Sequence, residues 1–333
     1  MLVESLPWPR ISYWQGYKYL QSTSGRYFVL QMTRKDSTNA YQLAILEQSS
    51  RIAFFKNGIA PYWIPSLEAG SYRDQSELLE MAHKLCLEHT SIMSLRIHAY
   101  IPGDPALEIA ELLLRESGYG ECEQQAPTKT RIIDLRPPIN EILAQFPAKV
   151  RTKLKLKKPE EIRVSELNVR EHLAELQSAL NDSFSRSSAQ QGNYDFESLS
   201  KTLENSPGEA AALGLFLSDN FGIAKAFITG VASFPLFEYT AAGSRSEARL
   251  RQFPFNYILL WRLVEIAKVR GSLLFDMGGI TDGGPDDPLA GISDFKRRFP
   301  GFEMSIGRER LLIINTLRWN LFVMLQGLKN LFS

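Results

Sequence analysis

The feature that most constrains the fold is the order of apolar segments in the second half of the chain. Three strand-like runs, AALGLFLS, GIAKAFITGVAS and LFEYTAA, follow one another between residues 211 and 242. The long segment 254–271 comes next, and its apolar residues recur every three or four positions, as on one face of a helix. Pro254 at its start and Gly271 at its end are typical of helix boundaries. A strand at SLLFDM, a short helix around SDFKRRF and a strand at FEMSIGRERLLIIN complete the predicted order.

A strand at EIRVSEL and two helices, REHLAELQSALNDSF and DFESLSKTL, precede these segments. The resulting order, β-α-α-β-β-β-α-β-α-β, is that of an N-acetyltransferase-like fold. The first half ends with the same helix, strand, helix and strand order. We therefore predict an α/β protein with two tandem acetyltransferase-like (GNAT-like) domains, each a mixed sheet flanked by helices. The double proline in RPPINEILAQF marks the boundary, which gives domains at 1–138 and 139–316 and an amphipathic C-terminal helix at 317–333.

Composition excludes several classes of protein. The 333 residues are 44% hydrophobic and carry a formal net charge of +1, so nothing in the overall charge indicates a nucleic acid or membrane partner. Two cysteines make neither a disulfide framework nor a zinc site. No signal peptide and no run of about 18 apolar residues is present, which predicts a cytoplasmic protein. Two placements stay open for the C-terminal helix: docked on the protein, or lying on a membrane or partner surface.

Motifs for metal ions and for covalent catalysis are missing. The four histidines are scattered, and the acidic loop DGGPDDP, with Asp282, Asp286 and Asp287, lacks the ligand pattern of a calcium loop. No serine lies in a Gly-x-Ser-x-Gly elbow, and neither cysteine has a histidine signature nearby. We therefore predict chemistry without a metal and without a covalent enzyme intermediate.

Phosphate recognition is predicted from basic residues rather than from a glycine-rich turn. GGITDGG matches neither the Walker nor the dinucleotide spacing. In GSRSEARLRQFPFN no glycine follows Gly243, so the usual coenzyme A pyrophosphate turn is not expected before the long helix. Arg249 and neighbouring arginines keep this stretch cationic, which suits phosphate or tRNA. The basic run that begins at Arg151 is interpreted either as a solvated helix face or as a phosphate contact at the domain junction.

The chain resembles the Fem family of peptidoglycan bridge-forming aminoacyltransferases. The likeness covers most of the chain and runs through ESGYGECEQQAPTKTRIIDL, FPAKVRTKLKLKKPEEIRV, the segment from FEYTAAGS to FDMGGI, and GISDFKRRFPG, in the family's order. The residues between Glu160 and Ala210 show no sustained heptads, so the coiled-coil arm of some members is absent.

The resemblance implies transfer of an amino acid from aminoacyl-tRNA to an amine of a peptidoglycan precursor peptide, carried on UDP-MurNAc or on lipid II, with no cofactor. It also implies that Lys296, in the FK motif, takes part in the chemistry, and that Tyr239 lines the substrate cleft. Phe295 and Phe299 are expected to anchor the helix and to orient Lys296 outward. Arg297, like Arg151, is a weaker candidate for phosphate contact.

Two other functions stay open. One is an acyl-CoA-dependent N-acyltransferase acting on a sugar or polysaccharide precursor, because relatives with a double fold of this kind do such chemistry. The other is a non-catalytic scaffold or tRNA-binding relative, in which the basic helix and the C-terminal helix would serve partner binding. We also expect the glycine-rich stretch from Gly278 to Gly291 to form a mobile rim that positions Lys296.

Overall fold

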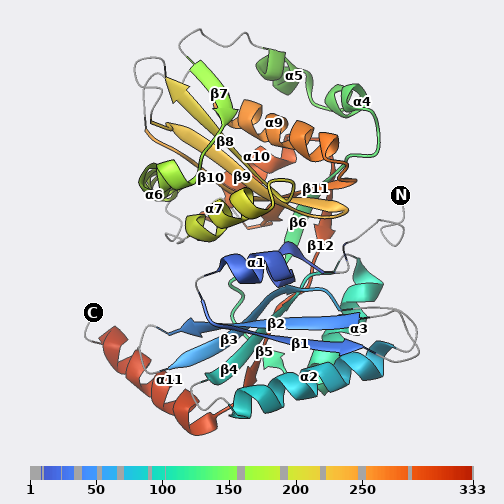
Figure 1. Ribbon diagram of the computed structural model, residues 1–333, viewed down its shortest axis with the longest axis vertical. Coiled ribbons are helices and arrows are strands. Elements are labelled where there is room, and N and C mark those ends of the chain that lie inside the picture. The colour runs from blue at the N-terminus through green and yellow to red at the C-terminus, as the bar shows by residue number, and fades with distance from the viewer. Residues whose placement is uncertain are drawn as a thin grey trace.

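The structure is a computed structural model. It describes residues 9, 11–23, 25–33, 40–50, 55–65, 71–88, 92–101, 103–155, 162–187, 194–217, 223–246, 253–283 and 287–331. Two mixed sheets lie one above the other along the long axis, each flanked by helices (Figure 1). This arrangement confirms the predicted α/β class with two GNAT-like units.

The first sheet has six strands in the order β1-β2-β3-β4-β13-β5. Helices α2 (Ser71–Glu88) and α3 (Asp104–Glu116) pack on its outer face, while the short η2 (Tyr13–Gln15) and α1 (Tyr17–Ser22) lie on the side of the second sheet (Figure 1). Strands β3 and β4 run parallel, and the other described pairs of this sheet are antiparallel. The strands are β1 (Tyr27–Thr33), β2 (Ala40–Ser49), β3 (Lys56–Trp63), β4 (Ile92–Ala99), β5 (Gly120–Glu121) and β13 (Glu309–Ile313).

The second sheet has seven strands in the order β12-β6-β11-β10-β9-β8-β7. Its parallel pair is β10 and β11. One face is covered by α6 (Leu173–Ser187) and α7 (Phe196–Asn205), and the other by α4 (Ile139–Ala144), α5 (Ala148–Lys155), α9 (Phe255–Val269) and α10 (Ala290–Arg297). The strands are β6 (Lys129–Asp134), β7 (Ile162–Glu166), β8 (Ala210–Leu217), β9 (Ala226–Ser233), β10 (Leu236–Ser244), β11 (Leu274–Ile280) and β12 (Phe302–Ser305).

The two sheets exchange strands, which sequence reasoning did not anticipate. Strand β6 precedes the expected boundary at residue 138, yet it pairs with β11 and β12 in the second sheet. Strand β13 belongs to the expected second domain, yet it pairs with β4 in the first sheet. The boundary between 1–138 and 139–316 therefore does not separate the two sheets. In the first sheet β13, which lies next to β4 of the parallel pair, comes from the second half of the chain. In the second sheet β6, which lies next to β11 of the parallel pair, comes from the first half.

A shared apolar layer holds the exchanged strands in place. Tyr100 from the end of β4, Ile132 from β6, and Leu236, Leu274 and Met304 from the second sheet form one buried cluster. Because these side chains are almost fully removed from water, their burial opposes separation of the two sheets. Residues from both halves are thus fixed relative to one another at the level where β10 and β11 meet.

One predicted strand needed correction, and one strand was not predicted. The segment FEMSIGRERLLIIN is not one strand, because it divides at Gly307 into β12 and β13 of different sheets. A Cβ at Gly307 would lie 2.0 Å from the carbonyl oxygen of Ala99, so only glycine fits where the chain crosses β4. Strand β3 was missed altogether, since Gly58 and Pro61 interrupt its apolar pattern.

The C-terminal helix α11 (Thr316–Leu331) docks on the first unit (Figure 1). Several of its apolar side chains are exposed to solvent. Its Phe322 ring packs edge-on against Phe55, with ring centroids 5.7 Å apart. Leu317, Leu321 and Met324 are exposed on the opposite side. Among the described helices, none is both long enough and apolar enough to cross a membrane.

Candidate functional site

Strands β10 and β11 diverge halfway along the second sheet and leave a fork. Their parallel pairing ends at Glu238 opposite Asp276. Beyond this level β10 shifts register against β9 after Tyr239, and β11 shifts register against β6 after Asp276. Gly278 adopts a φ of +76°, and its amide donates to the Asp276 carboxylate at 2.6 Å. Both strands therefore bend away from each other at the same level, and their edges become available to a ligand.

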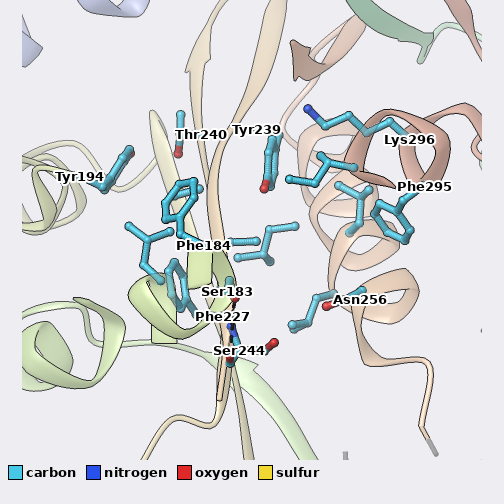
Figure 2. Close-up of a pocket in the computed structure, with 18 of the residues that line it drawn as sticks. Ser183, Phe184, Tyr194, Phe227, Tyr239, Thr240, Ser244, Asn256, Phe295 and Lys296 are labelled. Carbon is cyan, nitrogen blue, oxygen red and sulfur yellow. Dashed lines mark hydrogen bonds between the residues drawn. The ribbon is translucent and has the colours of Figure 1, made fainter. Parts of the chain in front are cut away.

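A pocket of about 420 Å³ opens along the free edge of β10 (Figure 2). Most of its wall is apolar and comes from both faces of the sheet: Phe184 of α6, Phe227 of β9, and Leu259 and Phe295 of α9 and α10. Figure 2 shows the Lys296 ammonium near one end of the pocket and Ser244 toward the other. The exposed Arg186 donates to the Ser244 carbonyl and hydroxyl oxygens, at 2.9 and 2.8 Å. The pocket thus runs from a buried cation to an exposed one.

Lys296 points inward, which corrects the expected outward orientation. Its side chain is 7% exposed, and Nζ donates to the carbonyl oxygen of Gly279 at 2.7 Å and lies 5.3 Å from the centre of the Tyr239 ring. Phe295 and Phe299 do anchor the helix, because both rings pack on Tyr257. Helix α10 lies between α9 and β11, so Phe295 and Lys296 are both directed into the protein.

Burial also changes the acidity of the groups at the fork. Loss of solvation lowers the pKa of Lys296 to about 8, although the nearby Asp276 carboxylate acts in the opposite direction. Tyr239 lies beside it with its hydroxyl in the pocket (Figure 2), and burial raises its pKa to about 12, so the phenol is neutral. Below pH 8 the fork therefore holds an ammonium ion and a neutral phenol at the end of the pocket.

Two buried carboxyl groups close the base of the fork. Asp276 accepts hydrogen bonds from the hydroxyls of Tyr100 and Thr130, besides the amide of Gly278. Burial raises the pKa of Asp276, and these hydrogen bonds oppose that rise. The Oε2 atom of Glu238 accepts a hydrogen bond from the indole N–H of Trp14 at 3.1 Å. Burial, and then the Asp276 charge, raise the pKa of Glu238 to about 8.

The similarity of this chain to known proteins lies in its fold. No protein-family model and no curated protein matches the sequence. Among solved structures, FemX is similar over 93% of this chain and 94% of its own, at 12% identity and a TM-score of 0.72. The chain has a FemX-like tandem GNAT fold. This confirms the fold that the resemblance to the Fem family implied.

Two further solved structures are similar in fold, with lower TM-scores. A C-terminal domain assigned to a lysylphosphatidylglycerol synthetase from Agrobacterium fabrum has 12% identity and a TM-score of 0.51, with 89% of this chain and 87% of that chain covered. A tandem GNAT protein from the clavulanic acid biosynthesis pathway has 11% identity and a TM-score of 0.50, with 94% and 91% covered.

Within this FemX-like fold, two of the arginines predicted for phosphate contact, Arg151 and Arg297, do not line the pocket. Arg151 donates to the carbonyl oxygens of Ala144 and Phe146 and so joins α4 to α5. Arg297 pairs with Glu303 and Asp282, at 2.8 and 3.0 Å. Both guanidinium groups thus serve internal contacts, and neither lines the pocket. Arg249 lies outside the described residues, so its role stays a prediction.

The acidic loop after β11 is occupied with internal contacts where the structure describes it. Asp282 pairs with Lys129 and Arg297, and Asp287 accepts from the Thr281 hydroxyl and the Leu289 amide. Asp286 and the middle of the expected mobile rim, residues 284–286, lie outside the described residues. Within the part of the chain that the structure describes, no three His, Cys, Asp or Glu side chains converge as metal ligands would.

Sequence reasoning missed Glu238, Asp276 and Arg186. Glu238 and Asp276 do carry a signal, because each is a carboxylate inside an otherwise apolar strand, in LFEYTAA and LLFDM. Such residues are rarely buried unless they are paired or functional. Arg186 carries no comparable signal, since it reaches the pocket only through the packing of α6 on β10.

Proposed function

We propose that this protein is an acyltransferase that moves an aminoacyl group from aminoacyl-tRNA to an amine of a peptidoglycan precursor peptide. The observation that carries the proposal is the buried ammonium of Lys296 at the fork, at the end of the pocket and beside Tyr239. Similarity to FemX over nearly the whole chain supports the family of reactions.

The chemistry needed is aminolysis of an ester. A neutral amine attacks the ester carbonyl, and negative charge develops on the carbonyl oxygen in the transition state. A pre-positioned ammonium in a site largely shielded from water stabilises that charge without reorganisation. Lys296 meets this requirement, because its helix is held by aromatic packing and its Nζ is fixed by a backbone carbonyl.

The pocket suits the donor. Its apolar walls accept an aminoacyl side chain, and its far end opens beside the exposed Arg186, where the guanidinium meets the phosphates that follow the terminal ribose. The alternative donor is an acyl-CoA, with a sugar or polysaccharide precursor as acceptor. The same apolar walls favour this candidate, since they would also take an acyl chain.

A transfer assay separates the candidates. The protein is incubated either with radiolabelled aminoacyl-tRNA and UDP-MurNAc-pentapeptide or lipid II, or with labelled acyl-CoA and amino sugars. We expect label in the peptide precursor in the first reaction only. Label in the amino sugar alone would replace the proposal with the second candidate, and no transfer in either reaction would favour a non-catalytic role.

We also propose that α11 makes a peripheral membrane contact, which would suit a lipid-linked acceptor. Its exposed Leu317, Leu321 and Met324 are spaced along one side, and the helix contains no acidic residue. We expect the wild type to co-sediment with phosphatidylglycerol-containing vesicles and Leu321→Glu combined with Met324→Glu to bind about tenfold less, as burying two charges costs at least this much. Leu87→Glu, an equally exposed leucine on α2, is the control. Equal sedimentation of all three proteins would contradict the contact.

A further inference from the structure

A second, much smaller cavity lies on the other side of the fork, between the two units. Its volume is about 80 Å³, enough for a few water molecules or the end of one narrow side chain. Residues from both halves of the chain line it, since Trp14, Tyr62 and Tyr100 come from the first unit and Glu238 and Asp276 from the second. The strand exchange described above fixes these residues relative to one another.

One wall of this cavity carries a buried polar atom without a partner. Glu238 is only 6% exposed, and while its Oε2 accepts from Trp14, its Oε1 has no hydrogen-bond partner among the described residues. Asp276, by contrast, is hydrogen bonded on both oxygens. Unsatisfied buried carboxyl oxygens are costly and rare in folded proteins. A ligand that donates to Glu238 would remove this cost.

The other walls are aromatic. The Trp14 and Tyr62 rings are stacked, with centroids 5.9 Å apart, and Tyr100 meets Tyr62 edge-on at 5.1 Å. A carboxyl group among aromatic rings is a site for a cation, because the ring faces and the carboxylate oxygens both have a negative electrostatic potential. Two neighbouring carboxyl groups would repel a phosphate or a carboxylate. The chemistry of this cavity therefore points to an organic ammonium.

The small cavity and the donor pocket meet at one point. Tyr239 and Thr240 line both of them. A Cβ added at Gly278 would lie 3.3 Å from the Tyr239 ring and 3.4 Å from Nζ of Lys296, so these three residues form the partition. An amine held by Glu238 thus approaches the fork from one side, while an acyl group in the larger pocket approaches it from the other.

We propose that the small cavity receives the primary amine of the acceptor, on an unbranched side chain, and that Glu238 takes the proton of this amine. The proposal rests on the acyl transfer inferred above. The ammonium gives one proton to Glu238, and the nitrogen lone pair then attacks the acyl carbon of the donor. The C–N bond forms and the C–O bond of the ester breaks, its electron pair leaving with the ribose oxygen. That oxygen takes a second proton from the nitrogen. Glu238 then releases to solvent the proton that it took from the ammonium.

The charged surroundings of Glu238 suit this role. The titratable groups that line the small cavity with Glu238 are Asp276, Tyr62, Tyr100 and Tyr239, and the charge of Lys296 acts on Asp276. Burial and Asp276 raise the pKa of Glu238 to about 8, nearer to that of a primary amine than the pKa of an ordinary carboxyl group is, and a bound ammonium acts in the opposite direction. A base is most effective when its pKa lies near the working pH.

The test compares the wild type with Glu238→Gln and with Glu265→Gln, which removes a carboxylate from an ion pair on the surface of α9. Transfer is measured from pH 6 to pH 10 at limiting acceptor. We expect kcat/KM of the wild type to rise with pH toward about 8, as Glu238 ionises, and that of Glu238→Gln to be about 100-fold lower and to lack this rise. Glu265→Gln should follow the wild type. An unchanged rate and an unchanged pH profile in Glu238→Gln would overturn the proposal.

Thermal unfolding checks that Glu238→Gln folds. A raised pKa means that the folded wild type binds more protons than the unfolded chain between about pH 4.5 and 8. The wild type therefore loses stability as the pH rises through this window, and glutamine, which does not titrate, does not. We expect the Tm of Glu238→Gln, relative to the Tm of the wild type, to increase as the pH rises. A difference in Tm that does not change with pH would argue against a buried proton on Glu238.

Binding of n-butylamine separates this proposal from the proposed function. If the wild type transfers no acyl group from any donor, the acyl transfer is wrong, but the cavity is still tested. We expect n-butylamine to raise the Tm of the wild type and of Glu265→Gln at pH 8, and not that of Glu238→Gln. An equal effect on all three proteins, or none on any, would overturn the amine site.

Discussion

Replacing Lys296 with alanine is expected to lower kcat for acyl transfer by about 10²- to 10³-fold, the usual cost of removing one donor to a developing oxyanion. The KM of the donor should change little, because most of the pocket wall is apolar and the ammonium acts mainly in the transition state. Single-turnover kinetics with aminoacyl-tRNA measures this directly. Lys84→Ala, which removes an exposed lysine from α2, is the control and should be as active as the wild type.

The pH profile gives a second measure of Lys296. Only the ammonium form stabilises an oxyanion, and burial lowers the pKa of Lys296 to about 8. The wild-type rate should therefore fall as the pH rises above about 8. Combined with the rise attributed to Glu238, this gives a bell-shaped profile. Lys296→Ala should lose the descending limb. A variant that kept wild-type turnover and the same limb would remove Lys296 from the mechanism.

Replacing Phe237 with alanine is expected to lower the free energy of unfolding by about 3–5 kcal/mol, as for other fully buried phenylalanines. Phe237 is 0% exposed and stacks on Phe275, with ring centroids 5.9 Å apart, directly before the level at which β10 and β11 diverge. Alanine would leave a cavity that the surrounding strands cannot close. Chemical denaturation of both proteins measures the difference.

Phe234→Ala is the matched control for this loss. Phe234 lies three positions earlier and is 73% exposed, so its removal should change the free energy of unfolding by no more than about 0.5 kcal/mol. Equal losses in the two variants would show that the apolar layer at the base of the fork does not stabilise the protein. Because Phe237 precedes Glu238, its loss should also loosen the fork and lower the transfer rate.

Much of the architecture could be predicted because local signals agree with it. The helical spacing of α9, with Gly271 in a left-handed conformation after its end, made this element and its neighbours recognisable. The order of elements then indicated a GNAT-like unit. The strand exchange could not be predicted in this way, since β6 and β13 are ordinary short strands whose partners are chosen by tertiary packing.

The candidate site, like the fold, could be predicted from the sequence only in part. Lys296 and Tyr239 were predicted from the resemblance to the Fem family, and both line the larger pocket. The direction of Lys296 was predicted wrongly, because the spacing of Phe295 and Phe299 does not reveal that α10 is enclosed on two sides. The predicted arginines were chosen for their charge alone, and charge does not show which cations are already paired within the protein.

The sequence by itself determined the two GNAT-like units, since periodicity, helix ends and residue order are local properties of the chain, while Lys296 was predicted from the resemblance of GISDFKRRFPG to a family motif. Only the tertiary structure decided what surrounds that lysine. Trp14, Tyr100 and Thr130 from one half of the chain meet Glu238 and Asp276 from the other at the fork. Burial at that junction removes water from two carboxyl groups and an ammonium, and this desolvation, which no local pattern encodes, brings the pKa values of Glu238 and Lys296 together near 8.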